Sequence, residues 1–121
     1  MTLFGTGIFK MIEQKDLLLV PFPFSDQSGI KVRPVVVISN NEFNEKSEDV
    51  VVIGITSNIS KDKYSLTLTN KDLETGRLIT NCCIKVENIL KLDKELIIKK
   101  IGKIKSGKFD QIKKILIEII S

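Results

Sequence analysis

The chain has 121 residues, of which 42% are hydrophobic, so it can form one domain with a modest core and does not belong to the disordered class. Lysine plus arginine exceeds aspartate plus glutamate by 19 − 15 = 4, and this mild positive charge favours an anionic partner such as nucleic acid or an acidic peptide. The absence of histidine excludes histidine-based acid–base catalysis and removes the usual zinc ligand.

The first half of the chain predicts three strands, because its apolar runs are short, rich in β-branched residues and separated by polar segments. Pro21 and Pro23 cannot donate to a ladder, so the first strand ends there and the polar segment 25–29 forms a loop. The charged segment 41–49 has room for one helical turn. The predicted strands cover residues 16–24, 33–40 and 50–57.

The second half predicts three more strands and one helix. Ser106 is the expected N-cap, and the apolar residues that follow it recur at three- and four-residue spacing. Short strands followed by one amphipathic helix predict a mainly β fold, a small and strongly bent barrel with the helix packed against it. The predicted strands cover 64–69, 78–89 and 97–104, and the helix stripe is Phe109, Ile112, Leu116 and Ile119.

We expect residues 1–11 to be an N-terminal extension that can be flexible, ahead of a natural start at Met11, and residues 12–121 to be a single domain. No apolar run approaches the about 18 residues that span a bilayer, so no membrane partner is expected. Cys82 and Cys83 are adjacent and point to opposite faces of a strand, which predicts two reduced thiols, no shared metal and a cytoplasmic protein.

Arg33 stands directly before Pro34 and the apolar run 35–38. The proline disfavours helical angles at Arg33, so the guanidinium sits at the end of a rigid strand, as a pre-positioned catalytic cation would. Only Arg33 and Arg77 among the 19 basic residues are arginines, and each is a candidate for forked contact with phosphate. The structural alternative is a strand-edge arginine that pairs with a carboxylate and limits aggregation.

Hydroxyl and charged side chains mark two further strand positions. Thr56 and Ser57 end the third strand, where a hydroxyl can donate to a phosphate oxygen; the alternative is a threonine that bonds its local backbone. Lys85 and Glu87 lie two apart on one strand face and offer a base and an acid. The alternative there is an exposed ion pair worth ~0–1 kcal/mol.

Taken in order, three segments resemble the MazF/PemK family of toxins from bacterial toxin–antitoxin pairs: "KDLLLVPFPFSDQSGIKVRPVVVIS", "VVVIGITS" and "GRLITNCCIKVENILKLDKELIIKKIGKI". The resemblance runs from about Asp16 to the C-terminus. It implies an SH3-like barrel with a C-terminal helix, assembled as a homodimer. It also implies a sequence-selective endoribonuclease for single-stranded RNA that needs neither metal nor cofactor, and a cognate antitoxin whose disordered C-terminal segment covers the RNA groove.

The resemblance also implies site residues. Arg33 in "RP" matches the family's catalytic arginine, and Thr56 in "IT" matches its catalytic threonine. Lys85 and Glu87 match more loosely the basic residue and acid that some members carry, whereas other members use a first-loop carboxylate. Asp26 and Asp16 are therefore rival candidates for the base. The first loop, "DQSGIKV", departs from the "GSE…G" of many members. The expected RNA contacts are Ser57, Asp26, Ser28, Lys31 and Arg77.

In the implied reaction the ribose 2′-hydroxyl attacks the adjacent phosphorus and leaves a 2′,3′-cyclic phosphate and a 5′-hydroxyl. We expect Glu87 to act as base and Arg33 to stabilise the developing charge, while Thr56 holds a non-bridging oxygen with Lys85 in support. The alternatives are a catalytically silent or gyrase-poisoning relative and an SH3-like scaffold that captures a peptide.

Overall fold

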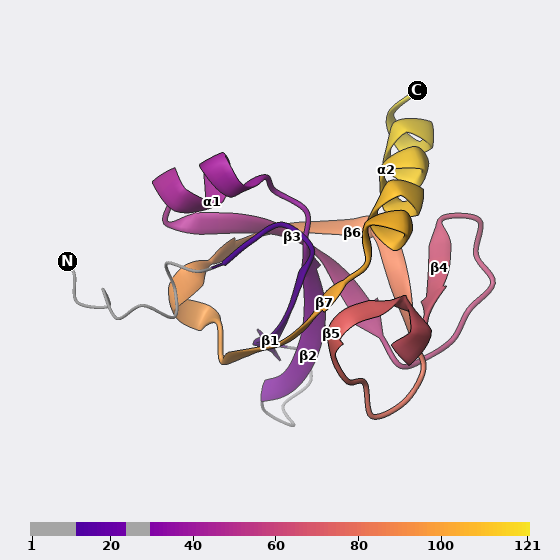
Figure 1. Ribbon diagram of the computed structural model, residues 1–121, viewed down its shortest axis with the longest axis horizontal. Coiled ribbons are helices and arrows are strands. Elements are labelled where there is room, and N and C mark those ends of the chain that lie inside the picture. Colours follow the sequence, from indigo (N-terminus) through magenta and orange to yellow (C-terminus); the bar gives the residue numbers. More distant parts are fainter. Residues whose placement is uncertain (1–11, 24–29) are drawn as a thin grey trace.

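The computed structural model describes residues 12–23 and 30–121 and shows an antiparallel seven-stranded sheet with two α-helices (Figure 1). The sheet order is β4-β6-β3-β2-β1-β7-β5. The strands are β1 (Asp16–Pro23), β2 (Ile30–Val37), β3 (Asp49–Thr56), β4 (Ser65–Leu68), β5 (Leu73–Gly76), β6 (Cys82–Asp93) and β7 (Lys99–Ile104). The helices are α1 (Asn41–Lys46) and α2 (Ser106–Ile120), and two single 3-10 turns are η3 (Asn70–Asp72) and η4 (Lys94–Leu96).

The two faces of the curved sheet bury separate apolar cores, because β-branched strand residues alternate between them. The central strands contribute to both: in β2, Val36 joins the first core while Val35 and Val37 join the second. The first core is completed by α2 through Phe109 and Ile112, and the second by Ile97 after η4. This two-sided burial is why the apolar run after Arg33 has no polar alternation.

Helix α2 packs beside β6 (Figure 1). Lys108 donates to the carbonyl of Thr67 in β4 at 3.0 Å, and the same ammonium lies 3.6 Å from the Asp72 carboxylate in η3. The backbone N–H of Lys105 also donates to the Asp72 carbonyl at 2.8 Å. These contacts tie the start of the helix to β4 and to the turn that precedes β5.

A β-bulge in β7 changes which way its side chains point. Leu17 pairs with Gly102 but Leu18 pairs with Lys100, so Ile101 is the extra residue. Residues three apart on a regular strand face opposite sides, yet the bulge puts Lys100 and Lys103 on the same side of the sheet, facing Asp16.

A glycine pair allows β5 to lie against β7. Gly76, at φ +88°, is opposite Gly102 in the register, and a Cβ added at Gly102 would lie 2.6 Å from the Thr75 carbonyl oxygen. Only glycine fits so close an approach between the two backbones. This close approach of Gly76 to Gly102, which we call the crossing, fixes where the chain leaves β5. It therefore also fixes the position of Arg77, the next residue.

The predicted mainly β fold with a C-terminal helix is confirmed, and so is the helical turn in 41–49. Other sequence predictions need correction. The second strand begins at Ile30 and not at Arg33, and the long strand begins at Cys82 and not at residue 78. Strand β5 lies where a loop was expected; its four residues are mostly exposed at the sheet edge and show no apolar alternation.

The predicted cap of the C-terminal helix is also wrong. Lys105 is the N-cap and makes no side-chain cap hydrogen bond, while Ser106 is the first helical residue. The Ser106 hydroxyl instead accepts a hydrogen bond from Lys15 Nζ at 2.9 Å. The expected N-terminal extension, residues 1–11, lies outside the described residues.

Candidate active site

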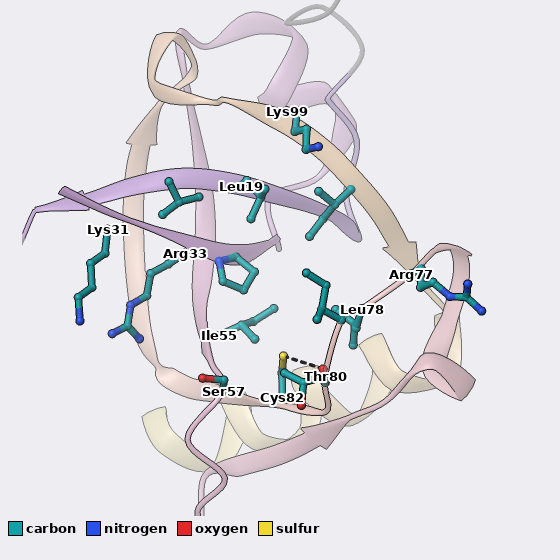
Figure 2. Close-up of a pocket in the computed structure, with 14 residues that line it drawn as sticks. Leu19, Lys31, Arg33, Ile55, Ser57, Arg77, Leu78, Thr80, Cys82 and Lys99 are labelled. Atoms are coloured by element: carbon teal, nitrogen blue, oxygen red, sulfur yellow. Dashed lines mark hydrogen bonds between the residues drawn. The ribbon is translucent and has the colours of Figure 1, made fainter.

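A cavity of about 560 Å³ opens beside β2, between the end of β3, the segment 77–82 and the start of β7 (Figure 2). Its floor is apolar and its rim is cationic. The apolar lining comes from Leu19, Val32, Pro34, Ile55, Leu78, Ile79, Cys82 and Ile101. The polar and charged lining comes from Lys31, Arg33, Ser57, Arg77, Thr80 and Lys99.

The cavity exists because β2 separates from β3 before it separates from β1. The ladder between β2 and β3 ends at the Val35–Gly54 pair, whereas β1 still pairs with β2 at Arg33, Lys31 and beyond. Residues 31–34 therefore line an opening between the two strands. This separation exposes the guanidinium end of the "RP" motif to the cavity while its aliphatic neighbours stay in the core.

Both arginines of the chain line this one cavity, although they are 44 positions apart in the sequence (77 − 33). Figure 2 shows the Arg33 side chain directed toward Ser57, and Arg77 on the opposite side with its guanidinium directed outward. Lys31 shares the strand of Arg33, and Lys99 begins β7. Four cations from three parts of the chain line the site, and no carboxylate occurs among the described residues that line it.

Thr56 and Ser57 face different surroundings, as expected for consecutive strand residues. Ser57 lines the cavity with Ile55, and Thr56 does not. The Thr56 hydroxyl accepts a hydrogen bond from the backbone N–H of Asn58 at 3.1 Å, which is the local role that the sequence left open. In the β3–β6 register Thr56 is opposite Cys83, on the side of β6 that also carries Lys85.

Lys85 and Glu87 do share one face of β6, and they lie on the side away from the cavity. Lys85 Nζ is 2.5 Å from Asp62 Oδ2 and 3.8 Å from Glu87 Oε2. The hydrogen bond between Lys85 and Asp62 lowers the pKa of Asp62, with a smaller contribution from Ser60, and raises the pKa of Lys85. The ion-pair alternative is therefore realised, with Asp62 of the β3–β4 loop as an additional partner that the sequence did not reveal.

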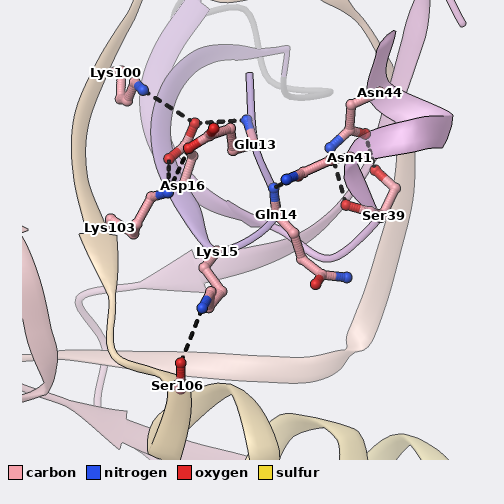
Figure 3. Close-up of polar contacts among 10 residues, drawn as sticks. All are labelled: Glu13, Gln14, Lys15, Asp16, Ser39, Asn41, Asn44, Lys100, Lys103 and Ser106. Atoms are coloured by element: carbon pink, nitrogen blue, oxygen red, sulfur yellow. Dashed lines mark hydrogen bonds and ion pairs between the residues drawn. The ribbon is translucent and has the colours of Figure 1, made fainter. Parts of the chain in front are cut away.

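Asp16, one of the rival bases, belongs to a different site (Figure 3). Its carboxylate is fully buried, accepts the backbone N–H of Glu13 at 2.8 Å, and lies 3.3 Å from Lys100 and 3.8 Å from Lys103. Lys103 in turn lies 2.6 Å from the Glu13 carboxylate. We refer to Glu13, Asp16, Lys100 and Lys103 as the β1–β7 ion cluster. None of its members lines the cavity.

The remaining predicted residues lie either in the cavity lining or outside the described residues. Lys31 and Arg77 line the cavity as expected, while Asp26 and Ser28 lie outside the described residues. The sequence did not identify Lys99, Ile79 or Thr80 as cavity residues. Nothing in "IIKKIGKI" distinguishes Lys99 from its neighbouring lysines, and only the pairing of Lys99 with Leu19 directs it to this side.

Cys82 and Cys83 are both free and buried, and they point to opposite faces as predicted. Cys82 lines the cavity and donates to the Thr80 carbonyl at 3.3 Å, whereas Cys83 donates to the Ser60 carbonyl at 3.7 Å. Burial, and to a lesser degree Cys83, raises the pKa of the Cys82 thiol, so it is the neutral thiol that faces the cavity. Within residues 12–23 and 30–121 no group of three or more candidate ligands could hold a metal ion.

A family model described as "PemK-like, MazF-like toxin of type II toxin-antitoxin system" matches residues 13–120. The chain belongs to this toxin family. Its match covers both strands that bear Arg33 and Thr56 and the whole cavity lining, so the segments that carry the sequence resemblance are those that build the site.

Solved structures with the same fold include members of this family. An endoribonuclease from Mycobacterial species is 18% identical, with a TM-score of 0.70 and coverage of 90% of both chains. A MazF from Deinococcus radiodurans is 14% identical, with a TM-score of 0.71 and coverage of 90% of this toxin and 96% of that chain. These likenesses establish the expected barrel architecture. In the described part of this toxin, no helix is both long and apolar enough to cross a membrane.

Proposed function

We propose that this toxin is an endoribonuclease that cleaves single-stranded RNA without a metal ion. The observation that carries the proposal is the convergence of Lys31, Arg33 and Ser57 on one cavity wall at the end of β3. Cations and a hydroxyl at a rigid strand end are suited to hold a phosphodiester and to stabilise negative charge that develops on it. Membership of a toxin family with endoribonucleases among its structural neighbours supports the same activity.

The reaction we propose is a transesterification within the RNA backbone. The ribose 2′-hydroxyl attacks the adjacent phosphorus, its proton passes to a base, and the bond from phosphorus to the 5′-oxygen breaks as that oxygen takes up a proton. The products are a 2′,3′-cyclic phosphate and a 5′-hydroxyl. The chain has no histidine, so a carboxylate is the proposed base.

The end of β3 can serve both sides of the sheet in this reaction. Ser57 and Arg33 line the cavity, and Thr56 lies toward the face of β6 that carries Lys85 and Glu87. An RNA strand that crosses the end of β3 would therefore place its phosphate between the guanidinium and the two hydroxyls. We propose Arg33 as the electrostatic clamp, Thr56 as the ligand of a non-bridging oxygen, and Lys85 in support.

Glu87 and Asp26 remain our two candidate bases, because Asp16 is buried against the lysines of the β1–β7 ion cluster. Glu87 is largely exposed and lies beside Lys85, so a 2′-hydroxyl could reach it. Cleavage by Glu87→Gln and by Asp26→Asn separates the two: the true base is the one whose loss lowers the cleavage rate at every RNA sequence and removes the fall in rate at low pH.

The central test is the cleavage rate of Arg33→Ala on a mixed RNA, with product ends mapped. We expect a loss of about 10²–10³-fold, the scale of removing one transition-state donor. Lys91→Ala is the matched control, because Lys91 is exposed, lies outside the cavity and pairs only with Asp49 among the described ion pairs. Cleavage by Arg33→Ala at the wild-type rate would refute the assignment.

Two substrate and solution controls test the chemistry itself. A 2′-deoxy nucleotide at the cut site should abolish cleavage there, because the nucleophile is missing. A chelator should leave the rate unchanged, since no residue of the proposed mechanism binds a metal. Cleavage that stops in the chelator, or that continues at the deoxy position, contradicts 2′-hydroxyl attack without metal.

We propose two protein partners for this cytoplasmic toxin: a second copy of the chain and a cognate antitoxin. One structural neighbour is an endoribonuclease in complex with its cognate antitoxin, with a TM-score of 0.71. The antitoxin would neutralise the toxin by covering the cationic cavity. The molar mass in solution by light scattering tests the dimer, and loss of RNA cleavage on adding the antitoxin tests the neutralisation.

The second candidate is a member of the fold that poisons gyrase or has lost catalysis. It makes the opposite prediction in the same RNA assay, in which the wild-type protein would leave RNA intact.

A further inference from the structure

The cavity has two cationic ends, and only one of them takes part in the chemistry proposed above. Lys31 and Arg33 stand at the β2 end on the side of Ser57, whereas Lys99 lies above Leu19 and Arg77 lies at the side away from Arg33, with its guanidinium directed outward (Figure 2). We infer that Arg77 and Lys99 form a second phosphate subsite and that Ile79 supports the base between the two. This inference rests on the proposed RNA substrate and extends it from one phosphodiester to the neighbouring nucleotide.

The two ends are built independently of each other. Arg33 is placed by the β1–β2 pairing, in which it lies opposite Val20. Lys99 is placed by the β1–β7 pairing opposite Leu19, and Arg77 follows the Gly76–Gly102 crossing. Because each cation is carried by a strand or lies next to a strand end, the spacing between the ends is fixed by the sheet. A fixed spacing suits a ligand with regularly repeated charges.

The surface between the two ends is apolar. Figure 2 shows Leu19, Ile55 and Leu78 between Arg33 and Arg77, and Thr80 beside Cys82; Pro34 and Ile101 also belong to the apolar lining. Single-stranded RNA has the matching alternation, since a flat base with polar edges is attached between successive phosphates. A small anion would use only one end of such a cavity, and an uncharged apolar ligand would use neither.

Ile79 is the clearest sign that this end binds something. Its side chain is fully exposed, at 104% of the reference area, although it borders the apolar floor of the cavity. Its exposed neighbours in the segment, Arg77, Thr80 and Asn81, are polar, and the apolar neighbour Leu78 is buried. An isoleucine left in water next to an apolar floor gains by covering the face of a base, which removes apolar area from water.

The experiment measures the affinity of the full-length protein for RNA that carries a 2′-O-methyl group at the cut site, so that binding is separated from cleavage. The RNA is shortened by one nucleotide at a time from each end. The wild-type protein should lose affinity at the step that removes the nucleotide in the second subsite. The double variant Arg77→Ala/Lys99→Ala should bind the longer RNA about tenfold more weakly and should show no loss at that step.

The salt dependence gives a second readout. Removing one phosphate contact on a single strand should lower the slope of log affinity against log salt by about 0.7. Lys46→Ala/Lys114→Ala removes the same two charges from α1 and the exposed side of α2, so it controls for net charge and should leave the length dependence intact. Ile79→Ser should weaken binding about threefold at low and at high salt, because its contribution is apolar.

Three outcomes would overturn the subsite. The first is a loss of affinity in the double variant that is the same for long and short RNA. The second is a loss of affinity in the charge control, Lys46→Ala/Lys114→Ala, as large as that in the double variant. The third is a change in molar mass on substitution of Ile79, which would show that the segment is an interface between copies. If the wild-type protein binds RNA with the predicted length step but cuts none, the proposed nuclease fails while the subsite stands.

Discussion

The cavity and the β1–β7 ion cluster use the same kind of side chain for different purposes. In the cluster, the ammonium groups of Lys100 and Lys103 approach a fully buried carboxylate of the same chain, that of Asp16. In the cavity, four cations come together around an opening with no carboxylate among its described lining residues. The lysines of the cluster are placed to stabilise the fold, whereas the cations around the opening are placed where a ligand could reach them.

Strand β7 contributes to both regions. It directs Lys99 toward the cavity and Lys100 and Lys103 toward Asp16. The roles of the two regions can therefore be separated by measuring both stability and cleavage for substitutions in each region. We expect changes in the cluster to lower the free energy of unfolding with little effect on cleavage by the folded fraction, and changes in the cavity to do the reverse.

Asp16→Asn should give the largest stability effect. The carboxylate is buried, accepts the Glu13 N–H and faces two lysines, so neutralising it should lower the free energy of unfolding by about 2–3 kcal/mol. Urea denaturation followed by circular dichroism measures the loss. Cleavage per folded molecule should stay near the wild-type value, and a loss as large as that of Arg33→Ala would return Asp16 to the list of candidate bases.

Gly102→Ala should give the next largest loss of stability, because the added Cβ strains the close approach of β5 to β7. The added Cβ would lie 2.6 Å from the Thr75 carbonyl oxygen, and the backbone shift that relieves this contact should cost about 1–3 kcal/mol. Weaker RNA binding should accompany the loss, because Arg77 directly follows Gly76 at this close approach.

Gly107→Ala is the matched control, since a Cβ there meets nothing within 4 Å and the residue is helical. It should raise the free energy of unfolding by about 0.5 kcal/mol. Equal stability of the two alanine variants would contradict the close approach of β5 and β7.

The smallest effect should be a pH dependence from Glu13. Its hydrogen bond to Lys103, together with the charge of that lysine, lowers the pKa of Glu13 from its ordinary value of 4.5. A lowered pKa in the folded state adds stability above the unfolded pKa, and this stability disappears as the pH falls through the folded pKa. Wild type should therefore exceed Glu13→Gln in free energy of unfolding at neutral pH, and the difference should vanish as the pH falls well below 4.5.

Denaturation of the wild type and of Glu13→Gln across that pH range measures this difference in the free energy of unfolding. The same pair raises the pKa of Lys103, so a parallel loss should occur as the pH rises above 10.5. A constant difference between wild type and variant at all pH values would mean that the ion pair does not form.

The sequence predicted those parts of the molecule that follow from local rules. The β-branched run after Pro34 and the stripe from Phe109 to Ile112 indicated buried strands and a packed helix; the stripe lies in the first core, and the run is divided between both cores. The two arginines stood out because arginine is rare in a chain rich in lysine, and both line the cavity; their role there stays a prediction. Strand β5 was missed because its pairing to β7 depends on backbone contact at two glycines and not on side-chain pattern.

Which residues make up the candidate site depends on contacts between distant parts of the chain, and no local sequence pattern shows these contacts. Asp62 approaches Lys85 from a loop 23 positions away in the sequence, and Lys99 joins Arg77 only through two separate strand pairings. Thr56 was expected to be catalytic and Ser57 to contact RNA beside it, yet only Ser57 lines the cavity. Alternation along a strand predicts that neighbours diverge, but it cannot say which of them faces the opening.

The extra residue Ile101 is the position at which β7 can change in length without exchanging its two sides. If it were deleted, Lys100 and Lys103 would lie two apart and would share one side by ordinary alternation, and Lys99 would stay opposite Leu19. Such a single-codon deletion would remove the Ile101 side chain from the cavity and leave the lysines facing as they do. Variation in the length of this strand should therefore concentrate at the bulge.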